Sequence, residues 1–341
     1  MNKKILLLGA GGFIGSHLTS RLVQDEKYLV TAVDIEKKKL VDIAFSFPYF
    51  HLDVFRDKDK LKSLIADSDI VVNMIAIANP GMYVKDPLYT FKLDFQENLW
   101  IVEQCVELRK RLIHFSTSEV YGKSPAQYSD RKEFPFDEDE SNLILGPIKN
   151  HRWIYASSKQ LLERVIHAYG LQQDLNYTII RPFNYIGPKI DFLPSEEEGV
   201  PRVFSYFMDA LLNQKPMSLV NGGEQKRCYT DIRDATDAHM LILGCEDERV
   251  HQQIINVGHV DNEVSIIELA EQMNQMYKDK FHGLPVSTEE VTGEAFYGEG
   301  YDDSDRRIPV SSKVEKLGWK PRYSMSDILS YSMSYYINGK R

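Results

Sequence analysis

A strand that runs directly into a glycine-spaced turn and a helix constrains this chain most. Four apolar residues at 5–8 precede Gly9, Gly12 and Gly15, and an amphipathic stretch follows over residues 13–23. Glycines at this spacing let the backbone approach a pyrophosphate, while the helix N-terminus offers unpaired N–H groups and a positive dipole end. The pattern therefore predicts a dinucleotide-binding turn between a buried strand and a helix.

An acidic residue at the end of the next strand indicates which dinucleotide is bound. The apolar run at 28–33 is followed by Asp34, which lies about 20 residues beyond the glycine turn, as in dinucleotide-binding folds. A carboxylate there accepts hydrogen bonds from a ribose diol and repels a 2′-phosphate. We therefore expect NAD, rather than NADP, as the cofactor.

Length, charge and cysteine content narrow the class of protein. The 341 residues suffice for one large α/β unit or two closely joined domains. A net charge of −9 disfavours nucleic acid and anionic membranes as partners. No apolar run approaches the ~18 residues of a membrane span, and the first strand begins near Met1, so we expect a cytoplasmic protein without a signal peptide. Cys105, Cys228 and Cys245 lack metal-ligand spacing, so no metal site is expected.

Strand-like runs alternate with helical patterns through the first half of the chain. The runs lie at 4–8, 28–33, 48–52, 69–75, 111–116 and 176–181. This alternation predicts an α/β fold with a Rossmann-like, doubly wound parallel sheet. The pattern breaks at Pro182. We expect residues 1–181 to form an NAD-binding domain and 182–341 mainly a smaller α/β domain for the substrate, with a late strand at about 254–257 as a candidate to return to the sheet.

A second group of polar residues follows the fifth strand. Thr117 lies just beyond that strand, at the edge of the sheet where ligands bind in doubly wound folds. Tyr155 and Lys159 lie four residues apart, on one face of a helix that begins near His151. An ammonium group and a positive nicotinamide ring lower the pKa of a phenol from ~10, so we expect Tyr155 to act as a base.

The tyrosine–lysine spacing alone is weak support, because it recurs in the chain. Only the pair at 155 and 159 lies in a sustained helical pattern, whereas the others lie in a polar loop, span a Gly-Pro, or adjoin a glycine at the terminus. These other pairs are Tyr128/Lys132, Tyr185/Lys189 and Tyr336/Lys340.

Together these residues resemble the extended short-chain dehydrogenase/reductase family. The resemblance runs along the whole chain and includes the glycine turn, Asp34, residues 73–76, the groups at 117, 155 and 159, and residues 181–184. Members of the family oxidise a sugar hydroxyl with bound NAD and use the ketone for epimerisation, dehydration or decarboxylation. The resemblance implies further cofactor contacts, at Phe13, Ile14, Ile35, Asp53, Val54, Ala76, Pro182, Tyr155 and Lys159.

Three segments resemble the branch that decarboxylates UDP-glucuronate. Dehydratases carry an Asp-Glu pair after the threonine, whereas this chain has Ser118-Glu119. An aspartate at 118 would face the carboxylate of the substrate, and a serine can donate a hydrogen bond to it. Residues 222–233 and 296–309 resemble the same branch. The resemblance assigns the diphosphate to Arg227 and Arg233, whose guanidinium forks match phosphate oxygens. The remaining implied substrate contacts are Ala78, Tyr83, Thr117, Ser118, Arg152, Asn184 and Tyr301.

The resulting hypothesis is a two-step reaction on UDP-glucuronate. Tyr155 removes the 4-hydroxyl proton while NAD takes the C4 hydride, and the C6 carboxylate, now β to a ketone, leaves as CO₂. Tyr155 and Thr117 stabilise the enolate, and Arg307 with Glu119 orients the carboxylate and handles the proton at C5. The catalytic set is therefore Thr117, Ser118, Glu119, Tyr155, Lys159 and Arg307. The product is UDP-4-keto-pentose, UDP-xylose or both.

Alternative activities and the oligomeric state follow from the same residues. Ring contraction would give UDP-apiose, which the segment at 187–192 favours, but apiose-forming enzymes carry cysteines where this chain has Ser118 and Leu143. A UDP-uronate 4-epimerase would keep the carboxyl group. A non-catalytic NAD-sensing protein would usually lack the tyrosine–lysine pair. A homodimer is expected, because the helical stretches at 87–109 and 152–170 carry Trp100, Ile101 and Ile154 beyond one apolar stripe.

Overall fold

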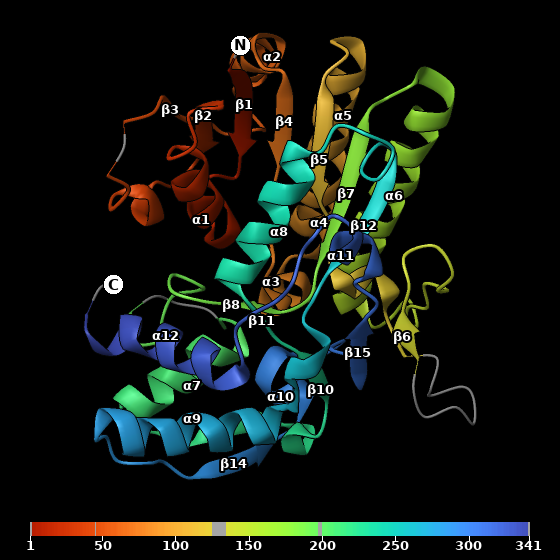
Figure 1. The fold of residues 1–341 in the computed structure, drawn as a ribbon. Coiled ribbons are helices and arrows are strands. Elements are labelled where there is room, and N and C mark those ends of the chain that lie inside the picture. The colour runs from red at the N-terminus through yellow and green to blue at the C-terminus, as the bar shows by residue number, and fades with distance from the viewer. Residues whose placement is uncertain (1, 45, 125–133, 197–199, 340–341) are drawn as a thin grey trace.

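A computed structural model of the chain describes residues 2–44, 46–124, 134–196 and 200–339, and these build a central seven-stranded sheet (Figure 1). The strand order is β12-β7-β5-β4-β1-β2-β3, and every neighbouring pair is parallel. The order reverses between β1 and β4, which confirms the doubly wound sheet. Its strands are β1 (Lys3–Leu8), β2 (Tyr28–Asp34), β3 (Tyr49–His51), β4 (Ile70–Asn73), β5 (Arg111–Phe115), β7 (Tyr177–Pro182) and β12 (Gln253–Val257).

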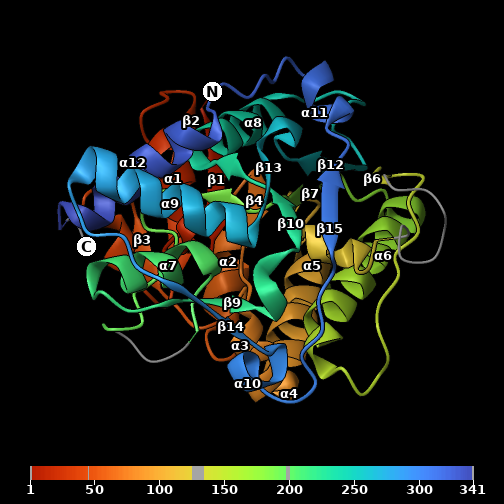
Figure 2. The same cartoon turned by 90° about the horizontal axis from the view of Figure 1, so that it is seen from below.

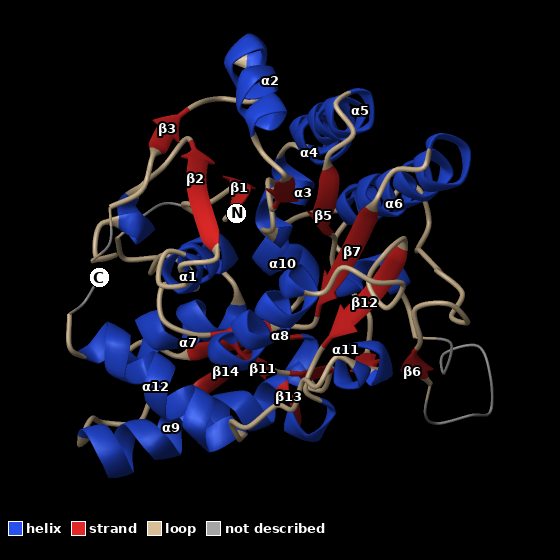
Figure 3. Cartoon of the chain, turned by 45° about the horizontal axis from the view of Figure 1, so that its top comes forward, coloured by secondary structure: helices blue, strands red, loops and turns tan. Residues whose placement is uncertain are grey.

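Helices cover both faces of the sheet (Figure 3). Along β1, Ile5 and Leu7 pack into one core cluster with α1 (Phe13–Leu22) and α8 (Ile232–Gly244), whereas Leu6 and Leu8 pack into a second with α2 (Lys58–Asp67), α5 (Asn98–Glu107) and α6 (Ile154–Gln173). Side chains of a strand alternate between faces, so a strand buried on both sides needs a continuous apolar run. This explains why the strands could be recognised as such runs.

The helical stretch expected at 87–109 is divided into α4 (Pro87–Phe91), a π-helical segment and α5, and α3 (Pro80–Lys85) precedes it. The side chains of Asn79 and Asp86 cap α3 and α4 by accepting bonds from the N–H groups of Gly81 and Tyr89. A π-helical segment, Lys92–Glu97, then leads into α5. Because π-helical turns are rare and concentrate at functional sites, this segment marks a region of interest.

The C-terminal half packs below the carboxyl edge of the sheet (Figures 1 and 2). Two of its elements, α8 and β12, nevertheless belong to the layers of the main sheet, and β12 pairs with β7. Within the described residues, the small sheets are β13-β10-β15-β6, β11-β8 and β14-β9. The remaining elements are β6 (Pro135–Phe136), β8 (Tyr185–Ile186), α7 (Val203–Leu212), β9 (Met217–Val220), β10 (Lys226–Cys228), β11 (Thr230–Asp231), β13 (Glu263–Ser265), α9 (Ile266–Phe281), β14 (Thr288–Val291), α10 (Gly293–Tyr297), β15 (Arg306–Pro309), α11 (Ser312–Lys316) and α12 (Met325–Ile337).

One hydrophobic cluster joins the two halves. It extends from the β1 face of the sheet through α8 into α7, α9 and α12. Among the described residues, no helix has the length and apolar character to cross a membrane.

Candidate active site

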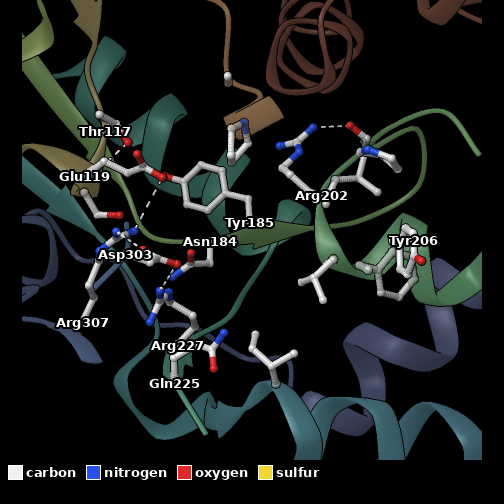
Figure 4. A pocket seen from close by; sticks show the side chains of 18 of the residues that line it. Thr117, Glu119, Asn184, Tyr185, Arg202, Tyr206, Gln225, Arg227, Asp303 and Arg307 are labelled. Carbon is white, nitrogen blue, oxygen red and sulfur yellow. Dashed lines mark hydrogen bonds and ion pairs between the residues drawn. The ribbon is translucent and has the colours of Figure 1, made fainter. Parts of the chain in front are cut away.

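A cavity of about 270 Å³ lies at the carboxyl ends of β1, β4, β5 and β7, where the C-terminal half meets the sheet (Figure 4). It brings together residues that are far apart in the chain. The site residues expected from the sequence that line it are Phe13, Ile14, Ala78, Tyr83, Thr117, Ser118, Glu119, Arg152, Tyr155, Pro182, Asn184, Arg227, Tyr301 and Arg307.

The glycine turn forms a cradle for an anion next to this cavity. Gly9 has a φ of +84°, and a Cβ atom there would lie 2.9 Å from the carbonyl carbon of Met74. At Gly12, by contrast, a Cβ atom would meet only the carbonyl oxygen of Gly9, at 3.3 Å, so this side of the turn faces open space. The first N–H groups of α1 lack intrahelical acceptors, and Gly12 offers no capping side chain. The turn therefore fits the pyrophosphate of NAD.

Gly11 was missed by the sequence analysis, yet it ties the turn to Asp34. Its N–H donates to the Asp34 carboxylate at 2.8 Å, and the N–H of Glu36 donates to the other carboxylate oxygen at 3.0 Å. A Cβ atom at Gly11 would overlap the carbonyl group of Glu36. Burial raises the pKa of Asp34, and the backbone N–H groups oppose this rise. The adjacent glycines at 11 and 12 were the available signal in the sequence.

The other expected cofactor residues lie outside the cavity lining, at the ends of neighbouring strands. Asp34 is the last residue of β2 and the exposed Ile35 follows it, Asp53 and Val54 come shortly after β3, and Ala76 comes shortly after β4. All of these strand ends lie on the carboxyl side of one parallel sheet. Together with the turn, they border the place where a dinucleotide binds in such folds.

Tyr155 is buried on the inner face of α6, with Lys159 one helical turn further along. Its ring stacks on Tyr83, with 4.5 Å between centroids and an angle of 6° between planes. Burial raises the pKa of Tyr155, the charges of Asp94 and Glu119 add to the rise, and hydrogen bonds with Thr117 and Tyr83 oppose it. The lowered pKa expected for this phenol depends on the nicotinamide ring beside it and stays a prediction.

Three buried arginines and two partly buried carboxylates form a charge cluster on the cavity that Tyr155 also lines. Arg152 donates two hydrogen bonds to Glu119, at 2.7 and 3.0 Å. Asp303 accepts from Arg227 at 2.8 Å and from Arg307 at 3.0 Å, and lies 3.5 Å from Arg152. Burial acts to raise the pKa of Asp303, but these arginines hold it below its ordinary range. The cluster carries one excess positive charge, which suits a polyanionic ligand.

Arg233 does not belong to this cluster. Its guanidinium donates to the Asp231 carboxylate at 2.7 and 2.9 Å, and lies over the rings of Tyr323 and Tyr331 at 3.6 and 4.0 Å. Asp231 also caps α8 by accepting a hydrogen bond from the backbone N–H of Arg233. Both the backbone and the side chain of Arg233 are therefore bound to Asp231 at the start of α8. The structure therefore places Arg233 outside the cavity, unlike Arg227.

The remaining tyrosine–lysine pairs form no comparable arrangement among the described residues. Tyr185 contacts His239 from β8, and Lys189 pairs with Asp42. The hydroxyl of Tyr336 donates to the carbonyl of Asp191. Tyr128, Lys132 and Lys340 lie outside the described residues.

An aromatic wall also lines the cavity, and of its residues only Tyr301 was expected from the sequence. Tyr297 and Tyr301 stack with centroids 4.2 Å apart, and Phe296 meets Tyr206 edge-on at 5.0 Å. The hydroxyl of Tyr206 hydrogen-bonds Ser218 at 3.1 Å. Planar rings beside a polar edge are suited to a nucleobase.

Comparisons with known proteins agree with this geometry. Residues 5–258 match the NAD dependent epimerase/dehydratase family. UDP-D-apiose/UDP-D-xylose synthase of Oryza sativa subsp. japonica is 41% identical over 97% of this chain and 88% of its own length. Bifunctional polymyxin resistance protein ArnA of Wigglesworthia glossinidia brevipalpis is 40% identical over 98% of this chain, which spans 51% of that protein.

Solved structures give the same result. The PbgP3 protein from Burkholderia pseudomallei superposes with a TM-score of 0.85 at 34% identity, covering 99% of this chain and 97% of that one. The UDP-glucuronic acid 4-epimerase from Bacillus cereus shares the fold, with a TM-score of 0.81 at 22% identity over 98% of this chain and 99% of that one. The chain thus belongs to the NAD dependent epimerase/dehydratase family, the extended short-chain dehydrogenase/reductases, and uses NAD.

Proposed function

We propose that this protein catalyses the NAD-dependent oxidative decarboxylation of UDP-glucuronate. The observation that carries the proposal is the placement of a buried phenol, Tyr155, and a buried guanidinium, Arg307, in one cavity beside the glycine turn. The phenol is the group needed to deprotonate a sugar hydroxyl. The guanidinium is the group that best binds a carboxylate.

The glycine turn, Asp34 and the buried end of α6 would hold the cofactor. The open side of Gly12 and the start of α1 take the pyrophosphate, and Asp34 takes the adenosine ribose. NAD, when bound there, would supply the acceptor for the C4 hydride of the sugar beside Tyr155.

Tyr155 acts as the base for the 4-hydroxyl group. Once it has taken that proton and C4 has become a ketone, the C6 carboxylate is β to a carbonyl group. The C5–C6 bond then breaks, its electron pair moves into the enolate at O4, and CO₂ leaves. Tyr155 and Thr117 donate hydrogen bonds to O4 and stabilise its negative charge. A proton delivered at C5, which we assign to Glu119 or a water held by it, completes the keto-pentose.

The charge cluster orients the substrate for this step. Arg307 and Arg152 are buried, and their Nε atoms have no hydrogen-bond partner within the described part of the chain, so each retains a free donor. Ser118 is buried next to them and adds a neutral donor to the carboxylate. The opposite charge of the cluster offsets the desolvation cost of a carboxylate bound here.

The C-terminal half would bind the UDP moiety. Arg227, a member of the charge cluster, and Asn184 line the same cavity as the aromatic wall, and Asn184 is held in the left-handed region at a φ of 44°. We assign the diphosphate to Arg227 and the uracil to the rings at 206 and 296. Tyr301 would contact the substrate between them.

The names of the relatives support this reaction class but leave the product open. The plant enzymes are named UDP-D-apiose/UDP-D-xylose synthases, and the chain spans only about half of ArnA, so functions of the rest of ArnA are not carried over. Ser118 is buried at the cavity, where the apiose-forming branch carries a thiol. We therefore favour UDP-4-keto-pentose or UDP-xylose over UDP-apiose.

Incubation of the pure protein with NAD and UDP-glucuronate tests the proposal. We expect CO₂ release, with NADH absorbance and product NMR separating the keto-pentose from UDP-xylose. The variant Tyr155→Phe should lose NAD reduction while keeping its affinity for NAD. A product that retains the C6 carboxyl group would instead identify a 4-epimerase and refute the proposal.

We further propose that the enzyme is a homodimer in the cytoplasm. Leu88 on α4 and Leu161 on α6 are exposed on the outer side of the helices that cover the sheet. Ile101 is fully buried in the sheet core, so its expected place on a dimer face is wrong; Trp100 and Ile154 are partly exposed. A monomer at micromolar concentration in sedimentation analysis would refute the dimer.

The three free thiols agree with a reducing compartment, which cell fractionation would test.

A further inference from the structure

Asp94 is a fully buried carboxylate that the proposed mechanism does not use. It lies in the π-helical segment between α4 and α5. One carboxylate oxygen accepts from the N–H of Ile77 at 3.2 Å, and the other has no hydrogen-bond partner within the described residues. A buried carboxylate with an unsatisfied oxygen is unfavourable unless a positive group compensates for it.

The compensating group is Lys159. Its Nζ lies 3.9 Å from the Asp94 carboxylate, and both side chains are fully buried. Within the part of the chain that the structure describes, the ammonium donates one weak hydrogen bond, at 3.3 Å, to the carbonyl of Phe115. The other acid nearby, Glu163, accepts two bonds from Arg181 at 2.6 and 3.1 Å and is therefore already neutralised.

The groups around this pair leave Asp94 as the counter-ion. Tyr155 and Glu163 face it from α6, Tyr83 from α3, Tyr89 from α4, and His114 from β5. Burial, and then Lys159, keep the pKa of His114 well below its ordinary value, so its ring is neutral. Burial likewise raises the pKa of Tyr83, which stays a neutral phenol.

We propose that Asp94 is a positioning residue that holds Lys159 as an ammonium ion beneath the reacting groups and so sets the pH range in which Tyr155 works. This inference rests on the roles of Tyr155 and Lys159 in the proposed function. Burial lowers the pKa of Lys159, and Asp94 opposes that fall more than Glu163 does. Without Asp94, the lysine loses the charge that keeps it protonated.

The effect on the pH profile has a defined sign. Removing one negative charge lowers the pKa of every acid–base group around it. Lys159 then loses its proton at a lower pH, and Tyr155, whose pKa the charge of Asp94 raises, ionises at a lower pH as well. Burial raises the pKa of Asp94 to about 7, and Lys159 opposes this rise, so the charge that Asp94→Asn removes is present above that pH. The limbs of the bell-shaped profile that lie above pH 7 should therefore move in the acidic direction, by about one to three units for charges at this separation.

The first test is the pH dependence of NADH formation in Asp94→Asn. This change keeps the side-chain shape and the acceptor for Ile77 but removes the charge. Glu97→Gln is the matched control, because Glu97 lies in the same π-helical segment and pairs with Lys58 on α2 at 2.8 Å. We expect the limbs of the pH profile to be displaced in Asp94→Asn and to stay at their wild-type positions in Glu97→Gln. A reduced rate with unmoved limbs in Asp94→Asn would overturn the proposal.

A thermal-stability cycle gives a readout that does not depend on activity. In the wild-type background, Asp94→Asn leaves a buried ammonium alone and should lower Tm. In the Lys159→Met background, the same change removes an unpaired carboxylate and should raise Tm. An equal loss of Tm in both backgrounds would mean that Asp94 has only a local packing role. Undiminished NADH formation by Lys159→Met itself would refute the proposed function instead, so the two failures are distinguishable.

Discussion

Replacing Gly11 with alanine should separate packing of the glycine turn from cofactor binding. A Cβ atom at Gly11 would lie 2.9 Å from the carbonyl carbon of Glu36, and closer still to its oxygen. Ordinary carbon contacts need about 3.5 Å or more, so the backbone after β2 must move by roughly 1 Å. Overpacking of this kind costs about 1–3 kcal/mol, and weakening the bond from the Gly11 N–H to the Asp34 carboxylate adds about 1.5–3 kcal/mol.

The free energy of unfolding of Gly11→Ala should therefore fall by roughly 2–4 kcal/mol in urea denaturation without NAD. Gly12→Ala is the matched control, since its Cβ atom meets only the Gly9 carbonyl oxygen, at 3.3 Å, and its φ of −71° suits alanine. This variant should keep its stability to within about 1 kcal/mol, yet lose at least about tenfold in NAD affinity by calorimetry. Wild-type stability in Gly11→Ala, or wild-type NAD affinity in Gly12→Ala, would refute this account of the turn.

Three further changes probe the charge cluster and its surroundings. Arg307→Met should reduce CO₂ release more than NAD reduction in single-turnover assays, and equal losses of both would count against its role with the carboxylate. Asp303→Asn should tighten UDP binding in calorimetry, because a competing carboxylate is removed from Arg227. The pKa of Asp303 is lower in the folded protein than in the unfolded chain, so its ionised form stabilises the fold above about pH 4 and this effect is lost as the pH falls further. In Asp303→Asn, the free energy of unfolding should therefore depend less on pH over that acid range. Arg233→Ala should lower Tm, since it frees the buried Asp231, but leave UDP affinity unchanged; a large loss of UDP affinity would restore Arg233 to the diphosphate site.

The parts of the fold that follow from periodic burial were predictable. A parallel strand covered on both faces needs an unbroken apolar run, which is why β1, β2 and β7 were found within one or two residues of their ends. Likewise, a spacing of four residues on a helix places Tyr155 and Lys159 on one face regardless of what surrounds them. Both inferences depend only on local geometry.

The direction in which a side chain points, and how deeply a helix face is buried, were harder to infer from the sequence. Arg233 and Arg227 lie in one segment that resembles a UDP pocket, but whether a side chain points into that pocket depends on neighbours such as Asp231. Ile101 illustrates the same limit, because an apolar helix face packs equally well on a core or on a second subunit.

Asp94 was missed although the sequence carried a signal. The spacing of Phe91, Asp94, Phe95 and Asn98 puts the two polar residues on the apolar face of a helix, where a buried acid needs a partner. The partner, Lys159, is supplied by a helix that begins more than fifty residues later, so no local pattern could identify it. The same holds for Asp303, which meets Arg227 and Arg152 only through the tertiary fold.

The charges on the two sides of Tyr155 differ, and each side suits one of the two molecules that react there, the substrate or the cofactor. On the substrate side, the arginines outnumber the carboxylates of Glu119 and Asp303, so the cavity attracts a polyanion and stabilises charge that arrives with it. On the cofactor side, Lys159 and Asp94 form a compensated pair, so the buried ammonium does not have to be balanced by the ligand. Between these two sides, burial raises the pKa of Tyr155, and the charges of Asp94 and Glu119 add to the rise. A positive charge beside the phenol opposes these effects, which is what the proposed mechanism asks of Lys159 and of the nicotinamide ring.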